Sequence, residues 1–172
     1  VIDVPFSYAE LFETAVKGIR NQNELAQESS EIADFWSMLQ GFQTSGKCIE
    51  KAHYRIRYMK SFRPLSVKED IEFKEARPIL YLNTAAVASL FNSRNAGSTS
   101  NRSNWSTIMS YLKSHASYLG LKQDRFTILL PSGLPDYTID IVNGEQVKKV
   151  KVNRPKALCF DYLQLKETFG LD

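Results

Sequence analysis

The hydrophobic period of the chain changes near residue 84, and this change constrains the fold more than any other feature. The apolar run ILYLN, which ends at Asn83, is short and typical of a buried strand, whereas helical spacing begins at Thr84. A second helix is predicted over about 104–119, and Gly120 is a suitable residue to end it. Its apolar positions follow helical spacing: Trp105, Ile108, Met109, Leu112, Ala116 and Leu119.

Strands are predicted to follow these helices. RFTILL, YTIDIV and QVKKVKV are rich in residues that favour strands, and the NGE sequence between the last two is typical of a hairpin turn. The order strand, helix, loop, helix and three strands is the pattern of a winged helix, in which the second helix enters the major groove of DNA. The connection between the two helices is longer than a tight turn, so a generic helix–sheet sandwich is the alternative. We therefore expect an α+β fold with a winged-helix-like domain and a small antiparallel sheet.

The N-terminal segment is predicted to be helical. Apolar residues with a rough helical period predict one helix over 5–20, and SSEIADFWSMLQGF predicts another, capped by Ser29 or Ser30, with the polar stretch NQNELAQESS between them. We therefore expect a helical N-terminal extension, residues 1–46, and a winged-helix-like α+β domain, residues 47–172. Because the chain does not begin with Met, we expect it to be part of a longer protein.

A strand or hairpin with one basic face is predicted within residues 47–63. In HYRIRYMKSFR, apolar side chains alternate with His53, Arg55, Arg57 and Arg63, and a period of two places the two kinds on opposite faces. The next segment, VKEDIEFKEA, is charged and is predicted to be an exposed connection. At the other end of the chain, ALCFDY predicts a strand and LQLKETFG a closing turn or short helix.

Positive charge is separated from negative charge along the chain. Residues 1–40 carry seven acidic and two basic groups, whereas the whole chain has a net charge of +3. Basic residues concentrate in 47–63 and in 148–156, which favours an anionic partner for the basic part. The alternative is that both clusters are solvated strand faces.

No catalytic motif is complete. GFQTSGKC places Gly41, Gly46 and Lys47 at the spacing of a phosphate-binding loop, but Cys48 replaces the hydroxyl residue that would hold Mg²⁺. The two histidines have no evident catalytic partner, and the cysteines have no metal-ligand spacing. We therefore expect no catalytic residue, no metal and no cofactor. The chain also lacks a signal peptide and an apolar run long enough to span a membrane, so we expect a cytoplasmic protein with no membrane partner.

Three sequence blocks carry a resemblance to a known family. They are EIADFWSMLQGF with YRIRYMKSF, RPILYLNTAAVASLF, and SYLKSHASYLG with the terminal KALCFDYLQLKETFGLD. Together they cover roughly residues 29–172 and resemble the C-terminal region of primase/helicase-type DNA replication proteins of phages and mobile genetic elements of gut bacteria. The resemblance implies a role in DNA replication. It supplies no catalytic residue, because the primase and ATPase motifs of that family lie upstream of this region.

Two functions fit these observations. The first is a non-catalytic nucleic-acid-binding accessory domain of a replicative primase/helicase-type protein, with DNA preferred over RNA. The second is a protein-interaction or oligomerisation module of the same parent, in which the acidic helices dock another domain or protomer. The oligomeric state itself is open. The candidate contacts to nucleic acid are all basic, with Arg55 and Arg57 forming a second patch apart from the others: Arg102, Lys113, Lys148, Lys149, Lys151, Arg154, Arg55 and Arg57.

Overall fold

The computed structural model describes residues 7–95 and 104–171, and it begins with one long helix, α1 (Tyr8–Thr44). A capping box starts this helix: the Glu10 N–H donates to Ser7 Oγ, and the Ser7 N–H donates to the Glu10 carboxylate. The prediction of two N-terminal helices was wrong. The polar stretch between them contains no proline and no glycine, so it continues the helix instead of ending it.

Four antiparallel strands form the main sheet. Their order is β1 (Tyr54–Phe62), β2 (Ile71–Asn83), β8 (Lys156–Asp161) and β3 (Tyr118–Gln123). The two central strands contain ILYLN and the ALCFD of ALCFDY, and these residues are buried as their apolar sequences predict.

Helices supply the core on one face of this sheet. Besides the C-terminal part of α1 they are α2 (Thr84–Asn95), α3 (Trp105–Ser114) and α4 (Tyr162–Phe169). From α1 alone, five large side chains enter this core: Ile32, Phe35, Trp36, Met38 and Leu39. A smaller cluster around Phe62, Tyr81 and Phe126 lies on the other face of the sheet. The expected boundary at residue 46 therefore does not separate two hydrophobic cores.

Two predicted boundaries were wrong. The helix expected over 104–119 ends at Ser114, and the chain continues as β3, whose residues pair with β8. The charged segment 67–76, expected to be a connection, is one only up to Asp70; residues 71–76 form the first half of β2, where Ile71 pairs with Phe62 at the far end of β1. In both segments, pairing with another strand, β8 or β1, replaces the conformation expected from the local sequence.

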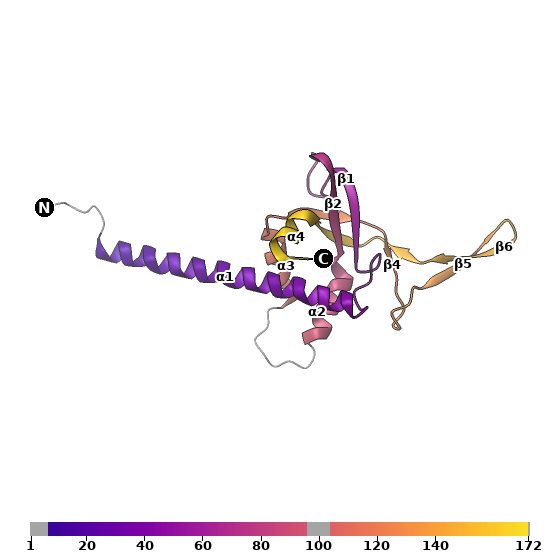
Figure 1. Ribbon diagram of the computed structural model, residues 1–172, viewed down its shortest axis with the longest axis horizontal. Helices are drawn as coiled ribbons and strands as arrows, with labels where there is room; N and C mark the ends of the chain where they lie inside the picture. Colours follow the sequence, from indigo (N-terminus) through magenta and orange to yellow (C-terminus); the bar gives the residue numbers. More distant parts are fainter. Residues whose placement is uncertain (1–6, 96–103, 172) are drawn as a thin grey trace.

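A hairpin arm extends from the body opposite to α1 (Figure 1). It consists of β5 (Tyr137–Val142) and β6 (Glu145–Val150), joined by Asn143 and Gly144, which both have positive φ, as a tight hairpin turn requires. At its base, β4 (Phe126–Thr127) pairs with β7 (Val152–Asn153). The α+β class with a small antiparallel sheet is confirmed, whereas the winged-helix assignment stays a prediction.

Candidate nucleic-acid interface

A surface groove beside β1 is lined by four cationic side chains. Its walls are Lys51, Arg55, Arg57, Arg125, Thr127 and Val152, and we call it the basic groove. β1 contributes two of the arginines, the turn between β3 and β4 contributes the third, and the β4–β7 pair contributes the two uncharged residues. The groove therefore combines segments that lie up to about one hundred positions apart in the sequence.

Arg55 and Arg57 point away from the helices because of the strand period. In the β1–β2 pairing, Arg55 lies opposite Tyr81 and Arg57 lies opposite Ile79. Both partners belong to the smaller cluster, on the face of the sheet that the helices do not cover. Side chains of directly paired residues lie on the same face. The predicted separation of apolar and basic faces in this strand is thus confirmed for both arginines.

Lys51 enters the groove from a turn with an unusual backbone. Its φ is 70°, in the left-handed region that non-glycine residues rarely adopt. Two hydrogen bonds hold it there: the Lys51 N–H donates to the Tyr54 carbonyl at 2.7 Å, and the Thr127 N–H donates to the Lys51 carbonyl at 2.8 Å. The second bond ties the turn before β1 to the opposite wall of the groove.

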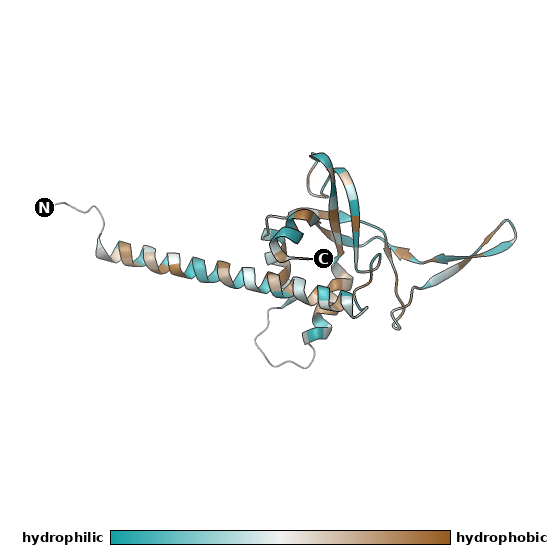
Figure 2. Cartoon of the chain, in the orientation of Figure 1, coloured by the Kyte–Doolittle hydropathy of each residue, from teal (hydrophilic) through white to brown (hydrophobic). Residues whose placement is uncertain are grey.

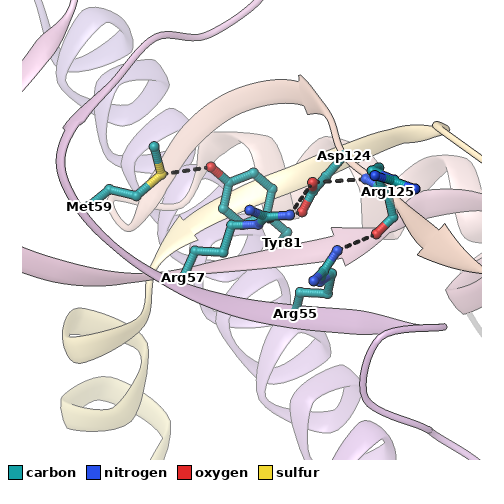
Figure 3. A network of polar contacts seen from close by, with 6 residues as sticks. All are labelled: Arg55, Arg57, Met59, Tyr81, Asp124 and Arg125. Carbon is teal, nitrogen blue, oxygen red and sulfur yellow. Dashed lines mark hydrogen bonds and ion pairs between the residues drawn. The ribbon is translucent and has the colours of Figure 1, made fainter.

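Asp124 holds the turn that carries the third arginine, Arg125, against β1 (Figure 3). Its carboxylate accepts two hydrogen bonds from Arg57, at 2.6 and 2.8 Å, and a third from the Arg125 N–H at 2.8 Å. Arg55 donates to the Arg125 carbonyl at 2.7 Å. Bidentate pairing of this kind fixes geometry as well as charge. Asp124 thus offsets one of the four cations and leaves an excess of positive charge in the groove.

The aromatic ring beneath Arg57 is uncharged. Arg57 lies over the Tyr81 ring, 5.8 Å from its centre, and the Tyr81 hydroxyl lies 3.0 Å from Met59 Sδ. Burial raises the pKa of Tyr81, so its hydroxyl keeps its proton at neutral pH. This side chain therefore adds no negative charge beneath the arginines.

Most of the other predicted cations lie on the arm or its base. Lys149 pairs with Asp140 at 2.8 Å, Lys151 pairs with Asp136 at 2.7 Å, and the Lys148 ammonium lies 4.1 Å from the Tyr137 ring centre. Arg154 and Lys113 are exposed, the latter on α3, and Arg102 lies outside the described residues. The arm lysines are thus partly neutralised by their own neighbours.

The basic groove reaches the segment that carries the second basic cluster of the sequence, but the cations of that cluster are not among its lining residues. Val152, which lines the groove, lies between Lys151 and Arg154 in the sequence, and the Ile128 N–H donates to the Lys151 carbonyl at 2.9 Å. The patch containing Arg55 is therefore adjacent to the base of the arm. Two of the four cations, Lys51 and Arg125, were not among the predicted site residues. Lys51 belongs to the predicted basic cluster, but Arg125 stands alone in its turn, so its sequence context gave no signal.

The motif that resembles a phosphate-binding loop has no free amides at its lysine. The N–H groups of Lys47 and Cys48 both donate to the Phe42 carbonyl, at 2.8 and 2.9 Å, and close the end of α1. A phosphate-binding loop needs such N–H groups to point at the ligand. This segment is therefore a helix terminus and contributes nothing to the basic groove.

The histidines and cysteines have structural contacts. His53 is buried and its Nδ1 accepts the Ile49 N–H, while His115 contacts Ser117 through Nδ1 at 2.7 Å. Cys48 and Cys159 are free and buried, and burial raises the pKa of Cys48 to about 11. At neutral pH that thiol is protonated and therefore a poor nucleophile.

Comparison of the chain with known protein families, with curated proteins and with solved structures finds no match in any of the three. Within residues 7–95 and 104–171, no helix is both long and apolar enough to cross a membrane.

Proposed function

We propose that this chain is a non-catalytic nucleic-acid-binding domain and that the basic groove holds the phosphate backbone. The observation that carries the proposal is the convergence of Lys51, Arg55, Arg57 and Arg125 on one concave surface. Asp124 accepts hydrogen bonds from Arg57 and from the Arg125 N–H, and its single negative charge does not cancel the four positive charges. A concave cluster of arginine and lysine is the kind of surface that neutralises phosphates and releases their counterions.

Contacts to phosphate, not to bases, are favoured by the chemistry of the groove. Some N–H donors of Arg55 and Arg57 are already occupied by hydrogen bonds to the Arg125 carbonyl and the Asp124 carboxylate. The two uncharged lining residues, Thr127 and Val152, offer few groups that could recognise a base edge. Binding of this type is largely independent of sequence. The resemblance to primase/helicase-type replication proteins adds the proposal that the ligand is DNA, and that the domain assists a parent protein in replication.

Replacing Lys51 and Arg125 together by Ala tests the proposal. Both side chains are exposed and lie outside the side-chain hydrogen bonds of the groove, so the fold should persist. We expect weaker binding of short single-stranded and duplex DNA, measured by fluorescence anisotropy at several salt concentrations. The slope of log affinity against log salt should fall by about one unit for each phosphate contact that is lost.

The matched control replaces Lys17 and Arg20 on α1 by Ala. It changes the net charge by the same amount at a site far from the groove in the sequence and on a different element. If both variants lose affinity equally, only the overall charge matters and the groove is not the site. Absence of binding by the unmodified chain at low salt would overturn the proposed function.

A further inference from the structure

The N-terminal half of α1 leaves the body with large apolar side chains in solvent. Leu11, Phe12, Ile19 and Leu25 are 51%, 65%, 59% and 65% exposed, whereas Ile32 and the apolar residues after it enter the core. Figure 1 shows this half extending away from the sheet, and Figure 2 shows apolar residues along it. Exposed apolar surface on such a scale marks an interaction site.

The charges of this segment lie on the opposite side of the helix. At 100° per residue, Leu11, Phe12, Ile19 and Leu25 fall on one side together with Ala15. The five charged residues between 8 and 27 fall on the other side: Glu10, Glu13, Lys17, Arg20 and Glu24. The apolar strip therefore contains no charge, and the segment has a net charge of only −1, so two copies would repel each other little.

Three residues of this segment lower its helix propensity. Gly18, Asn21 and Asn23 each disfavour a helix relative to alanine, glycine by about 1 kcal/mol. In proteins, most of the stability of a helix comes from packing its apolar face. Residues 8–27 receive little of that packing from the body, which points to a partner that covers the strip.

We propose that the partner is a second copy of this chain, which lies antiparallel along the same strip with Gly18 at the centre. Leu11 and Leu25 are each seven residues from Gly18, so an antiparallel pair places Leu11 of one copy against Leu25 of the other. Gly18 then meets Gly18, where the absence of a side chain lets the helices approach. On the neighbouring line of the strip, Ile19 is one residue from this centre, so the two copies of Ile19 lie about 3 Å apart along the pair at 1.5 Å per residue.

The length of the free segment fits this arrangement. Glu28, whose carboxylate accepts a hydrogen bond from Ser114 on α3, is ten residues after Gly18, and the helix begins at Tyr8, ten residues before it. Two copies centred on Gly18 therefore overlap along the whole free segment, about 30 Å at 1.5 Å per residue. The two bodies then lie at opposite ends of the pair, because each body follows the C-terminal end of its own free segment.

Such a dimer would present two basic grooves, one at each end. Two sites on one assembly raise the apparent affinity for a ligand long enough to reach both. The dimer itself does not depend on the proposed function, because α1 and the basic groove have no residue in common.

Light scattering coupled to size-exclusion chromatography tests the association. The unmodified chain should show a mass that rises from 19.6 kDa toward twice this value with concentration. Replacing Leu11 and Leu25 together by Glu should keep the monomer mass at every concentration. Lys17→Ala with Arg20→Ala changes the net charge equally on the opposite face and should leave the dimer intact. A monomer at all concentrations up to about 1 mM for the unmodified chain overturns the proposal.

Disulfide cross-linking tests the direction of the pair. Leu11→Cys and Leu25→Cys variants are oxidised separately and then as a mixture; the native Cys48 and Cys159 are buried and do not compete. An antiparallel pair joins the two variants in the mixture, because residue 11 faces residue 25. A parallel pair joins each variant to itself. Cross-linking of Leu11→Cys alone, or none in the mixture, contradicts the antiparallel arrangement.

Discussion

A chain that lacks residues 1–46 is expected not to fold, whereas one that lacks residues 1–27 is expected to fold as the body does. The longer deletion removes the five side chains that α1 places in the core, among them Phe35 and Trp36, which are 1% and 3% exposed. Loss of one buried Phe or Trp costs about 3–5 kcal/mol, and a domain of this kind has only about 5–15 kcal/mol in total. Nearly all of the described side chains that the shorter deletion removes are exposed, and Ser29 or Ser30 remains to cap the new helix start.

Circular dichroism and urea unfolding of the two truncated chains distinguish these outcomes. The chain 28–172 should unfold cooperatively, and its free energy of unfolding should be close to that of the full chain measured as a monomer. The chain 47–172 should show no cooperative transition. If 47–172 unfolds cooperatively instead, the core does not need α1, and the division expected from the sequence at residue 46 would stand.

The sequence correctly predicted those elements whose conformation is set by a few neighbouring residues. Alternation in residues 54–58 predicted β1 and the direction of Arg55 and Arg57, and the NG pair predicted the turn between β5 and β6. In each case the information lies within a few neighbouring residues, because a strand period and a turn type are local properties.

Other elements could not be predicted because a distant strand decides them. Ala116 and Leu119 continue the helical spacing of α3, yet the Asp161 N–H donates to the Ser117 carbonyl and the following residues pair with β8. The charged first half of β2 forms because Phe62 and Ile71 pair across the ribbon, where exposed charges are tolerated on both faces. Tertiary pairing overrides local preference at both positions.

The candidate site shows the same limit. Arg57 and Asp124 are 67 residues apart in the sequence, and only the fold brings them within hydrogen-bonding distance. The basic cluster near Lys51 is visible in the sequence, whereas the role of Arg125 follows from the position of the β3–β4 turn. Single basic residues in turns are common, and nothing nearby marks this one as part of a site.

Gly120→Ala is expected to destabilise the protein by about 3 kcal/mol or more. Sequence spacing placed Gly120 at the end of a helix, but it lies in β3, at an irregularity opposite Cys159, with a φ of +132°. A side chain is strained at this φ whatever space is present. There is also no space, because a Cβ at this position would lie 2.7 Å from Pro64 Cβ.

Urea unfolding of Gly120→Ala beside Gly41→Ala measures this effect against a matched substitution. Gly41 lies within α1, its φ is not positive, and a Cβ at this position would have no atom of another part of the chain within 4 Å. Alanine should therefore stabilise α1 at position 41 by up to about 1 kcal/mol, because glycine is the poorer helix former. Opposite signs for the two variants follow from the geometry. A nearly neutral Gly120→Ala would mean that the segment carrying Pro64 moves away easily and that β3 does not need glycine at this position.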